Sequence, residues 1–239
     1  MISAAFGGTP VTRVYPYDRG MARYDGIADW YDTDFLGDIH DPGRESAVRL
    51  LGEGPGRLLD IGCGTGAQTV GFRDAGWEVT GVDASEDMLR RARARGLEVV
   101  RTEATALPFD DGSFDAVVSL WTHTDIDGFA GVLAEAARVL RPDGPLVYAG
   151  GHPCFVGPHS RFFGAKGIPE LHPGYLADGR YSLEAPGVGP EGLRAKVGAV
   201  HLTLGRFLQA FLDAGLHLER FEELENRPYP FAVALRWRR

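Results

Sequence analysis

The fold is decided by residues 58–66, which read Leu58-Leu59-Asp60-Ile61-Gly62-Cys63-Gly64-Thr65-Gly66. An apolar run stops at three alternating glycines, a pattern typical of a buried strand, a tight turn and the start of a helix. Glycine lets the backbone turn sharply and approach a ligand closely. Asp83 follows seventeen positions after the last glycine, where a carboxylate suits the two hydroxyls of a ribose. The stretch therefore predicts a site for a cofactor that contains a nucleoside.

The spacing of the glycines indicates which nucleoside. A dinucleotide fingerprint reads G-x-G-x-x-G and aims a helix N-terminus at a pyrophosphate, whereas this chain has G-x-G-x-G with Asp60 just ahead. A carboxylate at that point would repel a pyrophosphate, but it can serve an ammonium group. The cationic groups of S-adenosylmethionine are an ammonium and a sulfonium. A nicotinamide cofactor therefore conflicts with both the spacing and Asp60.

At these residues the sequence resembles the class I S-adenosylmethionine-dependent methyltransferases, especially the small-molecule group that carries D-x-G-C-G-T-G. Three further segments look like later blocks of the same family, namely residues 81–89, 103–115 and 138–144. Four blocks in the same order are far more specific than one glycine triplet. The resemblance covers residues 24–148 well and the rest of the chain loosely.

The order of the expected elements predicts an α/β fold. Strands and helices alternate, which favours a doubly wound, mostly parallel, Rossmann-like sheet with helices on both faces. The resemblance implies seven strands, of which the last is antiparallel. We expect helices over 24–36, 43–51, 66–75, 85–95, 126–140 and 202–214, and strands over 57–61, 77–82, 97–101, 114–120, 145–150, 216–224 and 229–237.

The length of 239 residues suits a single domain. We divide it into an N-terminal lid segment (1–51, of which 1–20 lack periodicity), a cofactor-binding core (52–151), a substrate-capping insert (152–200) and a C-terminal helix with strands of the sheet (201–239). The insert is rich in glycine, proline and aromatic residues. It is expected to cover a planar or hydrophobic small-molecule acceptor. Packing of these aromatics onto the sheet is the alternative.

Composition excludes several classes of function. The net charge of −8 disfavours nucleic acid and anionic membranes as partners. Two cysteines imply no disulfide framework, and no signal peptide or long apolar run is seen. These features predict a cytoplasmic protein, either a monomer or a homodimer. No metal-ligand spacing is present.

The resemblance assigns roles around the cofactor. Asp60 would lie near the methionine end, and Asp83 would accept from both ribose hydroxyls. Glu103 stands where the family usually carries Asp for the adenine amino group. Cys63 is interpreted as a small filler rather than a nucleophile. The expected cofactor-binding residues are Tyr24, Tyr31, Asp60, Gly62, Cys63, Gly64, Gly66, Asp83, Ala84, Met88, Glu103, Ala104, Thr105, Ser119, Leu120 and Trp121.

The acceptor side is predicted less sharply. Methyl transfer needs alignment and, for a hydroxyl or an acidic carbon, a base near neutral pH. His123, His152 and His201 follow expected strands or the insert, and each is a candidate base. The leading hypothesis is O- or C-methylation of a small organic molecule by S-adenosylmethionine, which yields S-adenosylhomocysteine. The alternatives are a methyltransferase for a protein, tRNA or quinone, and a non-catalytic module that binds the cofactor.

Overall fold

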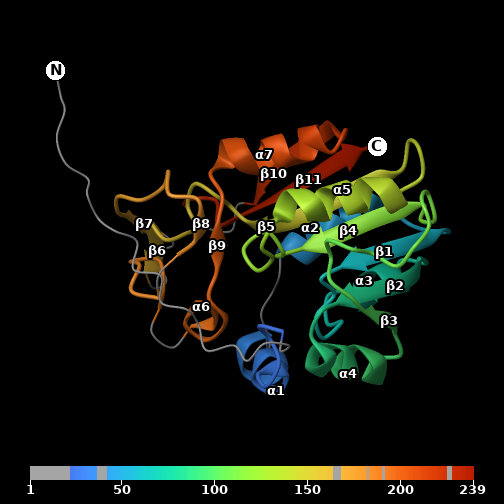
Figure 1. Cartoon of the computed structure of the whole chain (residues 1–239), viewed down its shortest axis with the longest axis horizontal. Coiled ribbons are helices and arrows are strands. Elements are labelled where there is room, and N and C mark those ends of the chain that lie inside the picture. Colours follow the sequence, from blue (N-terminus) through green and yellow to red (C-terminus); the bar gives the residue numbers. More distant parts are fainter. Residues whose placement is uncertain (1–21, 37–41, 164–167, 182, 190–191, 225–227) are drawn as a thin grey trace.

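A computed structural model describes residues 22–36, 42–163, 168–181, 183–189, 192–224 and 228–239. Figure 1 shows a central twisted sheet with helices on its faces and a group of small elements beside one end. The segment 1–20, expected to lack regular structure, lies outside the described residues. Within the described ranges, no helix is both long enough and apolar enough to cross a lipid bilayer.

The central sheet has seven strands in the order β10-β11-β5-β4-β1-β2-β3. Strand β11 pairs antiparallel with both of its neighbours, while β3, β2, β1, β4 and β5 are parallel. The predicted doubly wound sheet with an antiparallel last strand is confirmed. The bounds are β1 (Arg57–Ile61), β2 (Glu78–Asp83), β3 (Glu98–Arg101), β4 (Ala116–Leu120), β5 (Pro145–Gly151), β10 (His217–Leu224) and β11 (Ala232–Arg238).

The helices of the core are α2 (Pro42–Leu51), α3 (Val70–Asp74), α4 (Glu86–Ala94), α5 (Phe129–Val139) and α7 (Leu204–Asp213). Most begin and end within a few residues of the prediction. Helix α3 is the exception, because it begins at Val70 rather than at residue 66. Gly64 and Gly66 have φ of +54° and +76°, so the glycine loop continues as turns before the helix can start.

Alternation along the strands builds a core on each face of the sheet. In β1, Leu59 and Ile61 join the core under α5 and α7, whereas Leu58 joins the core under α2 and α3. In β11, Val233, Leu235 and Trp237 face the first core, and Ala232 and Ala234 the second. Figure 1 shows α5 and α7 side by side on one face, and these two helices contact each other.

The lid segment and the insert lie at the carboxyl ends of the parallel strands (Figure 1). The lid consists of α1 (Ala28–Trp30), which continues as a wider π-type helix over Tyr31–Leu36. The insert contains a hairpin of β6 (Ser160–Phe163) and β7 (Ile168–Leu171), the helix α6 (Leu193–Val197), and the short pair β8 (Gly179–Arg180) and β9 (Val200–His201).

One predicted boundary is wrong in the insert. The sequence interpretation expected a helix over 202–214, directly after His201, but His201 pairs with Gly179 in β9. Helix α7 begins only at Leu204, because the Thr203 side chain accepts the backbone N–H of Arg206 and caps the helix.

Candidate functional site

Two adjoining cavities open where the carboxyl ends of the parallel strands meet the lid. The first has a volume of about 300 Å³ and lies over the glycine loop. The second has a volume of about 460 Å³ and lies between the lid and the insert. Both are within the size range of small-molecule sites. They share four lining residues, Tyr24, Tyr31, Trp121 and Asp125, so the cavities meet at these side chains.

The glycine loop forms the floor of the first cavity. Gly62 has φ of +77°, and a Cβ there would lie 2.4 Å from Cγ2 of Thr122. Gly64 has φ of +54° and open space where its Cβ would be. Only glycine fits at position 62. Glycine at position 64 leaves the backbone open to a ligand. The nearby Thr65 Oγ1 is buried and has no hydrogen-bond partner among the described residues.

Asp83 stands at the end of β2 with its carboxylate held by the backbone. Its Oδ2 accepts the N–H of Gly64 at 3.0 Å, and its Oδ1 accepts the N–H of Ser85 at 2.8 Å. Burial raises the pKa of Asp83 to about 6, against the lowering effect of these hydrogen bonds. Two oxygens offer about four lone-pair sites. The carboxylate therefore keeps the capacity to accept two hydroxyl groups from a ligand.

Asp60 lies behind the glycine loop rather than in the cavity wall. It is 2% exposed, and its Oδ2 accepts the Thr69 hydroxyl at 2.7 Å. Burial, together with the negative charge of Asp83, raises the pKa of Asp60 to about 7, although the Thr69 hydrogen bond lowers it. A cation bound above the loop would hold this carboxyl in its charged form.

The structure brings most of the predicted cofactor residues to the first cavity. Those that line it are Tyr24, Tyr31, Gly62, Gly64, Asp83, Ala84, Met88, Glu103, Ala104, Thr105, Leu120 and Trp121. Four others support the wall from behind, namely Asp60, Cys63, Gly66 and Ser119. Gly66 leaves room for Leu97 and Ala92, since a Cβ there would lie 2.4 Å from the Leu97 side chain. The Ser119 hydroxyl donates to the Ile61 carbonyl at 3.1 Å.

Cys63 is a buried filler, as its sequence context predicts. It is 8% exposed, and a Cβ on Gly81 would lie 2.7 Å from its sulfur. Burial raises the pKa of the thiol, and the nearby carboxylates Asp60 and Asp83 raise it further. The thiolate that a nucleophile requires is therefore suppressed.

Sequence reasoning missed several lining residues, which come mainly from the lid and from the loop after β4. They are Ala22, Arg23, Val82, Ser85, Thr102, Thr122, Asp125, Ile126 and Asp127. Ser85 carried a usable signal, because a serine before two acidic residues is typical of a helix N-cap. Its hydroxyl caps α4 and donates to Asp25 of the lid at 2.6 Å.

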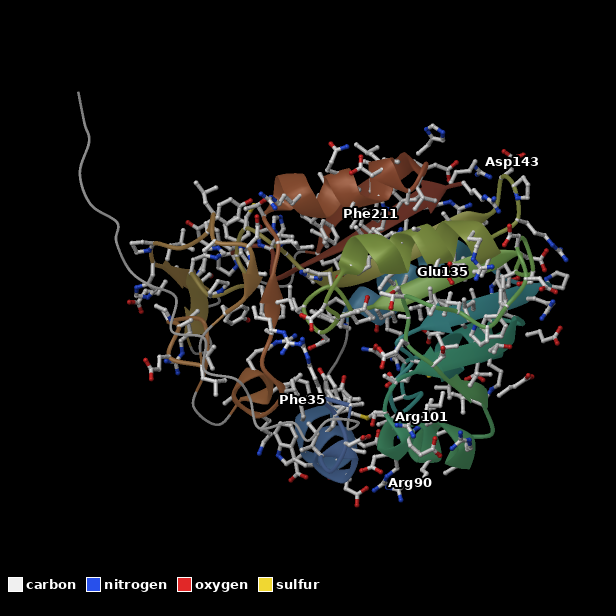
Figure 2. All side chains as sticks on the ribbon, viewed as in Figure 1. Phe35, Arg90, Arg101, Glu135, Asp143 and Phe211 are labelled. Carbon is white, nitrogen blue, oxygen red and sulfur yellow. The ribbon has the colours of Figure 1, made fainter. Side chains whose placement is uncertain are left out.

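The second cavity has a mainly apolar wall with a few polar groups. Figure 2 shows Phe35 on the lid, on the side that faces the insert. Phe35, Val156, Leu193 and Phe231 give the cavity apolar surface from four segments of the chain. The remaining lining residues are Tyr24, Tyr31, Leu36, Pro42, Gln68, Trp121, Thr124, Asp125, Gly151, Gly157, Ser160, Arg161, Tyr181, Gly187, Gly192 and Arg194.

Comparison with known proteins gives the same family as the glycine loop. A family described as a methyltransferase domain matches residues 59–148. The chain is 36% identical over 160 residues to a demethylmenaquinone methyltransferase of Tropheryma whipplei, covering 62% of this chain and 66% of the relative. It is 43% identical over 113 residues to a protein of the same name from Thermus thermophilus, covering 44% of this chain and 51% of the relative.

A solved structure agrees on the fold. The S-adenosylmethionine-dependent methyltransferase from Mesorhizobium loti superposes with a TM-score of 0.65 at 24% identity, over 90% of this chain and 99% of that one. This chain belongs to the class I S-adenosylmethionine-dependent methyltransferases. It spans two thirds or less of the length of the curated relatives named here.

The first cavity of the methyltransferase fits S-adenosylmethionine. The backbone at Gly64 and the spare lone pairs of Asp83 face the cavity and are features that a ribose and a polar chain can use. Family membership gives S-adenosylmethionine as the cofactor and S-adenosylhomocysteine as its product. When bound, the cofactor supplies a methyl group that its sulfonium activates.

The predicted histidines of the methyltransferase lie outside the walls of both cavities. His123 is 2% exposed and packs against Phe129, Tyr148 and Phe207. Its Nδ1 is hydrogen-bonded to the Tyr148 hydroxyl. Burial, with the charges of Arg194 and His201, lowers the pKa of His123 to about 3. The structure therefore corrects its expected place beside the acceptor, because the turn after β4 directs the ring into the core.

His152 and His201 are also held by the protein. His152 Nδ1 accepts the N–H of Cys154 at 3.1 Å, while its Nε2 lies 2.9 Å from Glu223 Oε1, so both ring nitrogens have partners. His201 Nε2 donates to the Tyr175 carbonyl at 2.8 Å. Burial and the nearby His159 lower the pKa of His201. Gly157 lies beside the His201 ring and lines the second cavity, so His201 stands behind the wall.

Proposed function

We propose that this methyltransferase transfers a methyl group from S-adenosylmethionine, bound in the first cavity, to a small and largely planar organic acceptor bound in the second. The observation that carries the proposal is the junction of the two cavities at Tyr24, Tyr31, Trp121 and Asp125. Methyl transfer is an in-line displacement, so donor and acceptor must approach from opposite sides of one opening. A wall shared by two cavities supplies such an opening.

The ribose of the cofactor is assigned to Asp83 and the adenine to the wall of Met88, Glu103 and Ala104. Asp83 has both carboxylate oxygens at the cavity end of β2, and the other three residues line the same cavity. This orientation places the methionine part over the glycine loop, within reach of the field of Asp60. The sulfonium then comes toward Trp121 and Tyr24, which border the second cavity.

A quinone is a second acceptor that a specific observation favours. Two of the relatives are named demethylmenaquinone methyltransferases. The second cavity presents a mostly apolar wall with aromatic side chains from the lid, from the loop after β4 and from the segment before β11. A flat bicyclic ring is chemically compatible with such a wall. We therefore rank a quinone or hydroquinone ring among the small planar acceptors, ahead of RNA, whose phosphates need a basic surface.

The proposal is tested first by the cofactor. Isothermal calorimetry of the chain with S-adenosylhomocysteine should give one site, and Asp83→Ala should weaken it by about 1–3 kcal/mol, as for lost hydrogen bonds to a charged group. Asp213→Ala, on the exposed end of α7, is the matched control and should leave the affinity unchanged. Absence of binding to the wild-type chain would overturn the proposal.

The acceptor class is tested separately. The chain is incubated with methyl-labelled S-adenosylmethionine and a cell extract, and the extract is then divided into macromolecular, lipid and small-molecule fractions. We expect label in a small molecule or a quinone. Label confined to protein or RNA would contradict the proposed acceptor and leave the cofactor assignment standing.

A further inference from the structure

One aspartate outside the predicted set of site residues lines both cavities. Asp125 follows His123 by two residues, on the loop after β4. Trp121 has φ of +62°, an uncommon conformation for a bulky residue, and it turns the chain sharply as it leaves the sheet. His123 then enters the aromatic core, whereas Asp125 lines both cavities. Asp125 is therefore at the opening through which the methyl group must pass.

The carboxylate of Asp125 is held in place but not saturated. Arg194 Nη1 donates to its Oδ1, and Arg194 Nη2 donates to the Thr124 hydroxyl at 2.7 Å. The Thr124 hydroxyl approaches Oδ2 at 3.4 Å, a long contact. The Asp125 side chain is 16% exposed and that of Arg194 is 21% exposed. A carboxylate has about four lone-pair sites, so Asp125 keeps acceptor capacity on the side of the cavities.

Tyr24 shares this position from the lid. It lines both cavities, and Asp125 lies close enough to raise its pKa. Burial raises the pKa of Tyr24 well above its usual value, and the charge of Asp125 raises it further, so Tyr24 stays a neutral donor. A neutral tyrosine cannot itself take a proton from an acceptor. The carboxylate is the one basic oxygen that the described residues place in the shared wall of the two cavities.

We propose that Asp125 is the catalytic base and that the acceptor presents a hydroxyl group, of the phenol or hydroquinone class, to it. This inference rests on the proposed function. The acceptor oxygen forms a bond to the methyl carbon while its proton passes to Asp125. The carbon–sulfur bond breaks, and its electron pair stays on sulfur, so the positive charge of the sulfonium is lost. Arg194 is a positioning residue that fixes the carboxylate toward the opening.

Binding of two cofactor analogues tests the position of Asp125 without an acceptor. Sinefungin carries an ammonium-bearing carbon where S-adenosylmethionine has its methyl-bearing sulfur, and S-adenosylhomocysteine has neither group. Asp125→Asn should lower the affinity for sinefungin by roughly 10-fold to 100-fold, which is the loss expected for a charged hydrogen bond. It should lower the affinity for S-adenosylhomocysteine by less than about threefold. S-adenosylhomocysteine affinity also reports that the variant is folded.

A matched control stands two residues along the same loop. Asp127 is also paired with arginines, Arg23 and Arg180, but it lines only the first cavity. Asp127→Asn should therefore change the affinities for both analogues by the same factor. If the Asp125→Asn variant no longer binds S-adenosylhomocysteine, the two affinities are measured for Asp125→Ser instead. An equal loss of both analogues in the Asp125 variant would overturn the placement, whereas no binding of either analogue to the wild-type chain would overturn the proposed function.

Turnover with two phenols tests the base itself. Asp125→Asn should lower kcat with 4-methylphenol by roughly 10²-fold to 10⁴-fold, the usual contribution of a general base, with little change in KM. The loss should be much smaller with 4-nitrophenol, which ionises near neutral pH without help. An equal loss with both phenols would overturn the base role. Failure of the wild-type chain to methylate either phenol, with the cofactor bound, would overturn the hydroxyl class of acceptor.

Discussion

At the scale of single residues, two carboxyls with raised pKa values lie at the first cavity. Asp83 is half-buried and lines the cavity, whereas Asp60 is buried behind the glycine loop, and removal from water raises their pKa values to about 6 and about 7. Ordinary aspartates titrate near 4. Without the cofactor, both therefore take up protons at a pH where surface aspartates are still ionised. Hydroxyl donors and cationic groups prefer the charged carboxylates, so cofactor binding and proton release are linked.

The first prediction concerns this linkage. S-adenosylmethionine should bind more tightly as the pH rises from about 5 to about 7, because the free chain loses the protons that compete with the cofactor. Near pH 6, binding should release protons from the Asp83 and Asp60 pair. Calorimetry in two buffers with different ionisation enthalpies measures that release. An affinity that is constant over this range, with no protons released, would show that neither carboxyl contacts or senses the cofactor.

A second prediction follows for stability. The raised pKa of Asp60 means that this group stabilises the folded chain below about pH 4, and that the stabilisation is lost as the pH rises through about 7. Asp60→Asn removes a buried charge yet can still accept from Thr69. At pH 8 without cofactor it should therefore raise the free energy of unfolding by about 1–3 kcal/mol, and at pH 4 by much less. Asp213→Asn, an exposed control, should show no such difference between the two pH values in denaturant titrations.

At the scale of elements, the lid and the insert are fastened to one loop after β4. Asp127 accepts Arg23 of the lid at 2.7 Å, and it also accepts Arg180 of β8. The lid is further held to α4, since Asp87 Oδ2 accepts the N–H of Gly26 at 2.7 Å. Lys196 of α6 lies 4.6 Å from the centre of the Trp30 ring. These contacts close the two cavities from one side.

The third prediction concerns the ion pairs of Asp127 with the lid and with β8. Asp127→Asn should loosen both the lid and β8. It should lower the affinity for S-adenosylhomocysteine roughly threefold to tenfold, because each exposed ion pair contributes at most about 1 kcal/mol. Hydrogen exchange of residues 22–36 should become faster. Glu222→Gln, which breaks the ion pair with Arg49, is the control and should leave exchange in the lid unchanged. Unchanged exchange in the Asp127 variant would show that the lid is held by its other contacts.

The elements that sequence predicted well are those with a strong periodic pattern. The strands β1, β2, β4 and β5 are buried on both faces, and the apolar runs of β1, β2 and β5 end at or just before glycine or aspartate. The insert escaped prediction because β8 and β9 have two residues each, too few for any periodicity. The strands of its hairpin have four residues each and helix α6 has five, so tertiary contacts decide their conformation.

The residues of the candidate site also fall into those that a local sequence pattern predicts and those that it does not. The glycine loop and Asp83 were predicted because their local chemistry demands those residue types. His123 lies outside both cavity walls because the direction of a side chain after β4 depends on the turn at Trp121, which no local pattern shows. The neighbouring Asp125 faces the cavities for the same reason. Histidine type alone was therefore a poor guide to the acceptor side.

At the scale of the whole molecule, the sheet separates two cores while its carboxyl edge carries both cavities. Helix α7 and β11 complete the core that supports the loop after β4. Phe211 of α7 is fully buried and stacks on Trp237 of β11, with ring centroids 4.5 Å apart and an interplanar angle of 2°. Figure 2 shows Phe211 beneath α7, on the side of α5 and the sheet. Neither Phe211 nor Trp237 lines either cavity.

The fourth prediction separates stability from function. Phe211→Ala should lower the free energy of unfolding by about 3–5 kcal/mol, as for a buried aromatic truncated in a core. Leu212→Ala, at the next position and 50% exposed, should cost well under 1 kcal/mol. Chemical denaturation measures both. The affinity of the folded Phe211→Ala chain for S-adenosylhomocysteine should stay within about twofold of wild type, and a large loss would show that α7 shapes the cofactor cavity.

The central claim is that donor and acceptor meet at Tyr24, Trp121 and Asp125. A crystal structure of the chain with sinefungin tests it most directly. We predict both ribose hydroxyls on Asp83, the adenine beside Met88, and the ammonium of the ligand within hydrogen-bond distance of Asp125. An ammonium directed away from the second cavity, or a ribose bound elsewhere than at Asp83, would contradict the account.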